Sequence, residues 1–290
     1  MNPDTALYVV VAFASGAVLL AWVYFRAYRV VRPPIGVINL RDVALMIGAI
    51  VLVPYLYVAV PPWLAAALLG VGMLTILQVT FEPILRRAWL AWVLALLLLG
   101  VDVAAALAYG APSTSFQLAN NTVLALAILG AANLWAQSGM KARDAAVLGA
   151  ALMAYDFVAT SLLPLMNDLV GRLAGLPFAP MITWASGDHE WLGIGLGDLL
   201  LAAVFPLVMR KAFGRAAGLL ALGLGLAALM AMLTLLDLRL VRITLPAMVA
   251  LGPLMVVQYL FWTRRLGVER TTWQFQQAEP QQGSLRGQHA

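Results

Sequence analysis

Long runs of apolar residues dominate the chain, and short polar, arginine-containing or Pro/Gly-containing stretches separate them. Crossing a hydrocarbon core of about 30 Å takes roughly 20 mostly apolar residues in a helix. Runs of this kind without alternation of apolar and polar positions predict helices, because lipid admits only helices and closed barrels. Nine runs qualify: 6–25, 43–60, 63–81, 88–109, 118–136, 145–166, 191–210, 216–236 and 243–262.

The composition excludes several classes of protein. Of the 290 residues, 63% are hydrophobic and only 11% are charged, whereas a soluble domain carries about 25% charged residues. A soluble enzyme, a nucleic-acid-binding protein and a disordered chain are therefore excluded. The sequence contains no cysteine, which rules out disulfides, thiolate catalysis and thiolate metal sites. We expect an all-α membrane protein, folded as a bundle of nine transmembrane helices.

The basic residues lie mainly on alternate connections between the predicted spans. Cytoplasmic loops carry the excess of Lys and Arg in membrane proteins, which predicts an N-terminus outside and a cytoplasmic C-terminus. We expect an integral, multi-pass protein of the plasma membrane of a prokaryote. Fifteen of the 18 basic residues lie on the predicted cytoplasmic side: Arg26, Arg29, Arg32, Arg41, Arg86, Arg87, Lys141, Arg143, Arg210, Lys211, Arg215, Arg264, Arg265, Arg270 and Arg286.

Three acidic residues lie well inside predicted spans, namely Asp102, Asp156 and Asp198. A charge at the centre of a bilayer costs at least about 2.5–3.5 kcal/mol, so each is a candidate functional residue. Counting about 1.5 Å per residue from the outer ends of their spans puts Asp156 and Asp198 at depths of roughly 15 and 11 Å. Consecutive antiparallel helices would thus bring these two carboxylates to similar levels.

Two carboxylates held this close can share a proton and titrate as one unit. One member can then activate a water molecule while the protonated member polarises a carbonyl oxygen, as in aspartic proteases. A proton-coupled transporter can use the same kind of acid pair. Asp102 carries no motif, and we expect it to be either a buried, hydrogen-bonded acid or an auxiliary catalytic or ion-path group.

Two short motifs contain the acids of the pair, and a third motif lies near the start of the last predicted span. The chain resembles the GxGD aspartyl intramembrane proteases, the family of presenilin and signal peptide peptidase, and the outside N-terminus is similar to the signal peptide peptidase branch. The resemblance covers roughly 145–262, and it includes an apolar stretch at 178–181. The matching motifs are Tyr155-Asp156, Gly195-Leu196-Gly197-Asp198 and Leu245-Pro246-Ala247-Met248, the last with Met in place of the family's Leu.

The resemblance implies a catalytic pair, Asp156 and Asp198, that needs no cofactor and no metal. It also implies transmembrane peptides or proteins as substrates, including remnants of signal peptides, within the lipid bilayer and without nucleic acid. A prepilin-peptidase-like protease, a proton-coupled transporter and an inactive scaffold are the alternatives. The residues that would bind substrate or shape the site are Tyr155, Gly195, Leu196, Gly197, Pro246, Ala247 and Met248.

We expect the chain to be organised in three parts. Residues 1–144 would form a scaffold of five to six helices, and residues 145–262 would form the catalytic part, with spans six to nine. Residues 263–290 would form a disordered cytoplasmic tail, because this segment is rich in Gln and poor in aliphatic residues.

Overall fold

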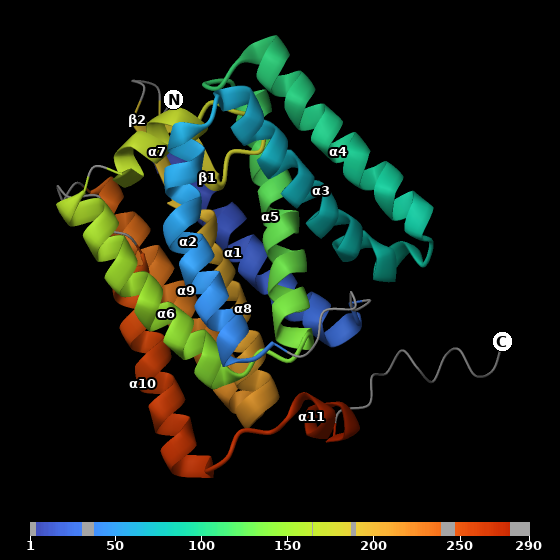
Figure 1. Cartoon of the computed structure of the whole chain (residues 1–290), viewed down its shortest axis with the longest axis vertical. Helices are drawn as coiled ribbons and strands as arrows, with labels where there is room; N and C mark the ends of the chain where they lie inside the picture. The colour runs from blue at the N-terminus through green and yellow to red at the C-terminus, as the bar shows by residue number, and fades with distance from the viewer. Residues whose placement is uncertain (1–3, 31–37, 164, 187–189, 239–246, 279–290) are drawn as a thin grey trace.

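The computed structural model describes residues 4–30, 38–163, 165–186, 190–238 and 247–278. Helices dominate this part of the chain, and one two-stranded antiparallel sheet joins them (Figure 1). The elements in order are α1 Asp4–Ala27, α2 Leu40–Ala59, α3 Pro62–Leu85, α4 Ala88–Tyr109, α5 Thr114–Gln137, α6 Ala142–Phe157, the π-helical turn Val158–Leu162, α7 Leu165–Leu173, β1 Met181–Ser186, β2 Glu190–Gly195, α8 Leu196–Phe213, α9 Arg215–Asp237, α10 Met248–Leu266 and α11 Thr272–Ala278.

Each of the nine predicted runs overlaps a helix in its described part, but the predicted end of the sixth run at residue 166 is wrong, because α6 ends at Phe157 and a π-helical turn follows. In the described part of the chain, six helices are long and apolar enough to cross a membrane: α1 to α5 and α9. The prediction of a mainly helical membrane protein is therefore confirmed. Of the other three, α6 has only 16 residues, and α8 carries Asp198, Arg210 and Lys211.

The predicted start of the seventh span at residue 191 is wrong, and the chain is not purely α-helical. Residues 190–195 form β2, which pairs with β1 in a register that places Thr183 opposite Gly193. A Cβ atom on Gly193 would lie 2.7 Å from Cγ2 of Thr183. The pairing thus needs glycine at this position, and α8 begins only after the strand, at Leu196.

The predicted disorder after residue 263 is wrong as far as Ala278. Helix α10 continues to Leu266, and a short helix, α11, follows at Thr272. Phe275 of α11 is buried and stacks on Phe25 of α1, with ring centroids 5.7 Å apart. This long-range apolar contact orders a segment whose composition alone favours disorder. Residues 279–290 lie outside the described part.

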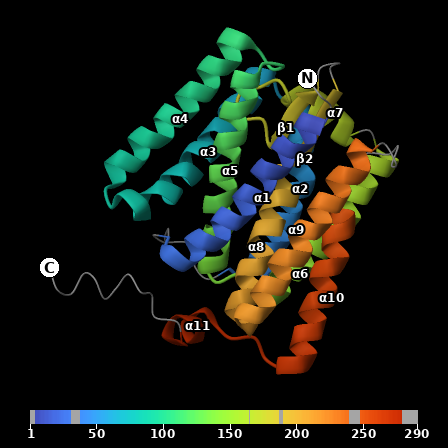
Figure 2. The same ribbon diagram turned by 180° about the vertical axis from the view of Figure 1, so that it is seen from behind.

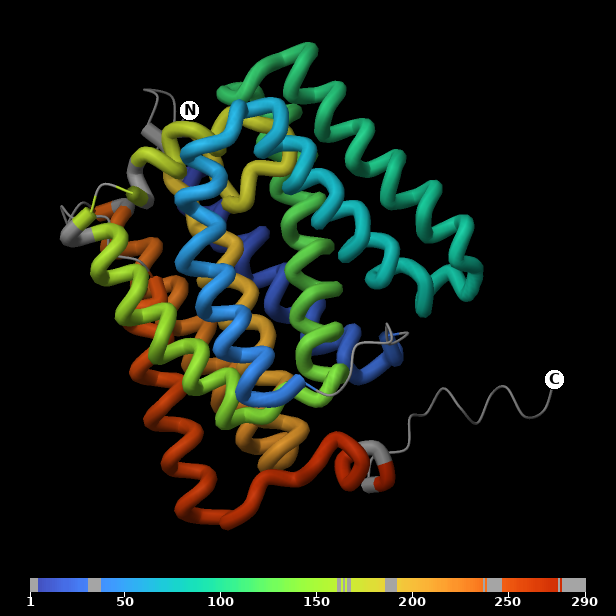
Figure 3. The backbone as a smooth tube through the Cα atoms, in the orientation of Figure 1, coloured from blue at the N-terminus to red at the C-terminus, as the bar shows by residue number. Residues whose placement is uncertain are grey.

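Helix α5 lies at the centre of the bundle and packs against α1, α3, α4, α8 and β1. Helices α3 and α4 form a hairpin at the periphery, and two opposite views show it turned away from α6 and α10 (Figures 1 and 2). The hairpin of β1 and β2 lies with α7 at the end of the bundle where α1 begins (Figure 3).

Two adjacent residues after α10 connect the opposite end of the bundle. Glu269 accepts hydrogen bonds from the backbone N–H groups of Ala142 and Arg143, at 3.0 and 3.1 Å, where α6 begins. Arg270 donates through Nη2 to the backbone oxygen of Arg210 at 3.1 Å, near the end of α8. We call Glu269 and Arg270 the C-terminal clasp, because they tie the start of α6 to the end of α8.

Candidate active site

Asp156 and Asp198 lie at the same end of two helices in contact. Asp156 is the second-last residue of α6, and Asp198 is the third residue of α8. The two helices pack against each other, and the carboxyl group of Asp156 lies near that of Asp198. Both side chains are half-buried. The structure thus brings together the two acids that the sequence singles out at similar depth.

The third motif meets Asp198 through the polypeptide backbone. The N–H of Met248 donates to Oδ1 of Asp198 at 3.1 Å, and Met248 is the first residue of α10. Because the donor is a backbone group, this contact does not depend on having Met rather than Leu at position 248. Ala247 and Met248 are both buried. Pro246 lies outside the described residues.

The glycine motif forms the junction between β2 and α8. Gly195 ends the strand, and a Cβ atom on it would lie 3.6 Å from Oδ2 of Asp198. Leu196 begins the helix, and its N–H donates to the backbone oxygen of Pro180 at 2.9 Å. Within the described residues, a Cβ on Gly197 would meet nothing within 4 Å. The absence of a side chain at Gly195 therefore leaves space beside Oδ2 of Asp198, the carboxylate oxygen that does not accept the N–H of Met248.

Tyr155 lies beside the acid pair on the side of α2. It is half-buried and lies near Asp156 and near Tyr55 of α2. Among the described residues its hydroxyl group has no hydrogen-bond partner, although the oxygen is buried. A buried hydroxyl next to a carboxylate is a free hydrogen-bonding group at the site.

A close crossing of α6 and α10 fixes the helix that carries Asp156. A Cβ atom on Gly252 would lie 2.9 Å from the backbone oxygen of Gly149, and one on Gly149 would lie 2.9 Å from the sulfur of Met255. Small residues at such crossings let helix backbones approach within a membrane. The crossing sets the position of Asp156 relative to Met248, which contacts the other aspartate.

Asp102 does not join the acid pair. It is fully buried on α4, and its Oδ2 accepts the backbone N–H of Phe178 at 2.9 Å. Phe178 has a left-handed φ of 64°, which is rare for a residue with a side chain. The expectation of a buried, hydrogen-bonded acid is confirmed: Asp102 holds the segment that leads into β1.

Three amide residues of α5 belong to none of the sequence motifs, although they contact the segment that leads to the site. The side chains of Gln117, Asn120 and Asn121 are buried and form hydrogen bonds with the backbone between 179 and 185. Their spacing of three and four residues places them on one face of a helix. Three amides on one face of an otherwise apolar span form a pattern by which the sequence alone could have identified these residues.

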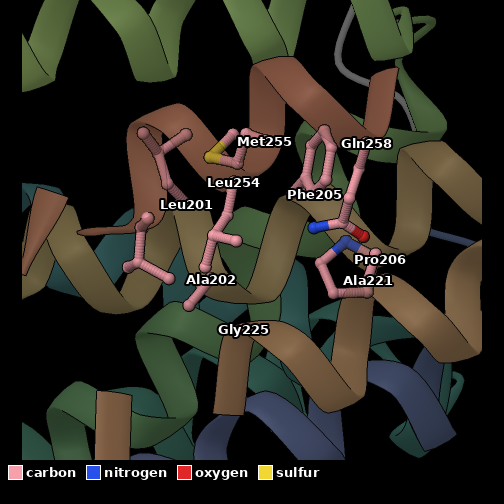
Figure 4. Close-up of a pocket in the computed structure, with 10 residues that line it drawn as sticks. Leu201, Ala202, Phe205, Pro206, Ala221, Gly225, Leu254, Met255 and Gln258 are labelled. Carbon is pink, nitrogen blue, oxygen red and sulfur yellow. The ribbon is translucent and has the colours of Figure 1, made fainter. Parts of the chain in front are cut away.

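A small hollow, with room for about one water molecule, lies between α8, α9 and α10. Leu201, Ala202 and Phe205 line it from α8, three, four and seven residues after Asp198, so they share the face of that acid. Figure 4 shows the amide of Gln258 beside Phe205 and Pro206. Oε1 of Gln258 is buried and has no hydrogen-bond partner in the part of the chain that the structure describes.

The described residues contain no group of three or more His, Cys, Asp or Glu side chains that could hold a metal ion. Asp188 and His189 lie outside the described residues. The described site presents two carboxyl groups, the backbone N–H of Met248 and the hydroxyl group of Tyr155.

The chain matches no model of a known protein family and no curated protein.

Proposed function

We propose that the protein is an intramembrane aspartic protease that hydrolyses peptide bonds within transmembrane segments. The observation that carries this proposal is the placement of Asp156 and Asp198 at the same end of two packed helices, with one oxygen of Asp198 accepting the backbone N–H of Met248. All three sequence motifs converge there. Two acids with a shared proton are the catalytic equipment of aspartic proteases.

In the proposed reaction one carboxylate removes a proton from a water molecule as its oxygen attacks the carbonyl carbon of the substrate. The other acid donates its proton to the carbonyl oxygen, which yields a tetrahedral diol. The diol then collapses, the C–N bond breaks and the nitrogen takes up a proton. The two carboxylates exchange roles between the steps, so the pair ends the cycle with one proton, as it began.

The hairpin before α8 supports a substrate that is bound in extended form. A transmembrane helix has its peptide groups hydrogen-bonded internally, so it must unwind locally before water can attack. The outer edge of β2 can pair with such an extended segment. Because β2 ends at Gly195, a paired segment would run past Asp198.

The arrangement in the membrane is part of the proposal. All nine long helices cross the bilayer, with the N-terminus outside and the C-terminus in the cytoplasm of a prokaryotic cell. Helices α6, α8 and α10 are shorter or more polar than the six apolar helices because they surround the site. In this orientation, which is similar to that of signal peptide peptidases, substrates have cytoplasmic N-termini and include remnants of signal peptides.

The test is cleavage of a synthetic transmembrane peptide by the purified protein in liposomes, with products identified by mass spectrometry. We expect cleavage by the natural chain and a loss of at least about 100-fold in Asp156→Ala and Asp198→Ala. Asp198→Asn is the matched control for folding, because its amide oxygen can still accept the Met248 N–H while the acid is gone. Cleavage that persists in both alanine variants would contradict the dyad.

A proton-coupled transporter is the second candidate, because an acid pair within a helix bundle can also carry protons. Uptake of a solute into the same liposomes, driven by acid and lost in the aspartate variants without any proteolysis, would favour the transporter over the protease.

A further inference from the structure

The backbone from Phe178 to Ala185 is held along one side by buried side chains. Asn121 makes two bonds with Thr183: its Nδ2 donates to the backbone oxygen at 2.8 Å, and its Oδ1 accepts the N–H at 3.1 Å. Oε1 of Gln117 accepts the N–H of Ala185 at 3.0 Å. The amides of α5 thus take the place of a neighbouring strand along β1.

A third amide continues the same row toward the start of the strand. Nδ2 of Asn120 donates to the backbone oxygens of Ala179 and Met181, both at 3.2 Å. Asn120 is 2% exposed and Asn121 is fully buried. Polar groups buried in a membrane protein cost free energy unless they are paired. These amides therefore pair the edge of β1, while Nε2 of Gln117 and Oδ1 of Asn120 have no hydrogen-bond partner among the described residues.

This bonding determines which groups of the hairpin remain open. Because both backbone groups of Thr183 turn toward Asn121, the pair Thr183 and Gly193 is of the non-hydrogen-bonded type in the antiparallel ladder. The bond from Leu196 N–H to Pro180 belongs to the other, bonded set. It follows that the N–H and C=O groups of Gly193 and Gly195 point away from β1, toward the outer edge of β2.

We propose that Asn121, together with Gln117 and Asn120, is a positioning residue for the site. These amides close the edge of β1, so that only the edge of β2 can accept an extended peptide. They also fix the register that places Gly195 beside Asp198. The role in cleavage rests on the proposed function, whereas the role in forming the hairpin can be measured without any proteolysis.

The first test measures the hairpin alone in the full-length protein. The natural chain has no cysteine, so the double variant Ala185→Cys, Trp191→Cys creates one defined pair of thiols. Residues 185 and 191 face each other across the hairpin, at a non-hydrogen-bonded position, where Cβ atoms lie closest. Under mild oxidation we expect the disulfide to form about tenfold more slowly when Asn121→Leu is added.

The matched control is Asn133→Leu, on the same helix. Asn133 is also fully buried, but its Nδ2 donates to the backbone oxygens of Ala21 and Leu129, at 3.1 and 2.9 Å, and not to the hairpin. We expect this variant to leave the rate of disulfide formation within about twofold. Equal rates in the Asn121→Leu and Asn133→Leu backgrounds would overturn the proposal.

The second test follows the bond that is cleaved in the synthetic transmembrane peptide. We expect Asn121→Leu to raise KM more than it lowers kcat, and to spread cleavage over neighbouring bonds. Asn121→Gln, which keeps the amide, should partly restore the original cleavage site. A variant that cuts the same bond with unchanged KM would overturn the positioning role. If the natural chain cleaves no peptide, the proposed function is wrong, and so is the role of Asn121 in positioning a substrate. The cross-linking rates then still measure the role of Asn121 in forming the hairpin.

Discussion

Two neighbouring helices, α4 and α5, have nearly the same length but opposite environments. In α4 the most apolar window has a mean hydropathy of 2.4 and is 28% buried, whereas in α5 the values are 1.3 and 56%. The buried polar side chain of α4 is Asp102. Helix α5 buries a series of amides: Gln117, Asn120, Asn121, Asn133 and Gln137.

The difference between α4 and α5 shows that neutral polar residues can join separate segments within a membrane bundle. The amides at the start of α5 bond the hairpin, and those near its end bond α1 and the segment after it: Asn133 donates to Ala21, and Oε1 of Gln137 accepts the N–H of Val30 at 2.9 Å. Such bonds contribute about 0.6 kcal/mol each on average in membrane proteins. Helix α4 is an apolar peripheral element, whereas α5 connects the N-terminal helices to the candidate site.

The largest expected effect concerns the end of α5. Nζ of Lys211 is buried and donates to the backbone oxygens of Ala136 and Met140, at 2.7 and 2.5 Å. Lys211→Met leaves these oxygens without that donor, and we expect a loss of about 3 kcal/mol in the free energy of unfolding, measured by SDS titration in mixed micelles. Arg87→Met, at the exposed start of α4, should change it by less than about 0.5 kcal/mol. Equal losses would contradict the distinction between the two helices.

A smaller effect separates two glycines of the same helices. A Cβ on Gly130 of α5 would lie 1.8 Å from Oγ1 of Thr80, which donates to the backbone oxygen of Ile76. Gly130→Ala should therefore destabilise the protein by about 1–3 kcal/mol through overpacking. Gly100→Ala on α4 should stabilise it by roughly 0.5–1 kcal/mol, because no described residue lies within 4 Å of the new methyl group. The same titration measures both, and effects of the same sign would be inconsistent with this packing.

The smallest effect is expected at Asp102. Asp102→Asn keeps an oxygen that can accept the Phe178 N–H, so stability should change by less than about 1 kcal/mol. Cleavage of the synthetic peptide should fall by no more than about threefold, because this acid holds the loop and lies outside the proposed dyad. A loss as large as that in Asp198→Ala would mean that the charge of Asp102 takes part in the chemistry.

The sequence predicts the helices well because their signal is local. Each run of about 20 apolar residues reports its own environment. The predicted distances of Asp156 and Asp198 from the ends of their spans are wrong, because α6 ends at Phe157 and α8 begins at Leu196. The two acids still lie at the same end of the bundle, because consecutive runs are antiparallel. Asp102 could be recognised as a buried, bonded acid, although its partner, Phe178, lies 76 residues away.

What the sequence does not predict depends on contacts between distant segments. The strand at 190–195 forms because residues 181–186 pair with it and α5 closes the other side. The helix at 272–278 forms where Phe275 meets Phe25 of α1. No pattern within either segment indicates which distant segment it will contact. The amides of α5 carry no charge, so the high cost of a charge in the membrane, which singles out the three aspartates, does not single out these residues.

The C-terminal clasp makes α6 a lever. From Ala142, whose N–H is held by Glu269, to Asp156 there are 14 residues, a length of about 21 Å at 1.5 Å per residue. A tilt of about 3° at the clasp therefore displaces the carboxylate by about 1 Å, and a displacement of that size can change a reaction rate about 100-fold. In the proposed protease, a small movement of the short segment after α10 would therefore change the rate of cleavage, although this segment lies at the opposite end of α6 from the acid pair.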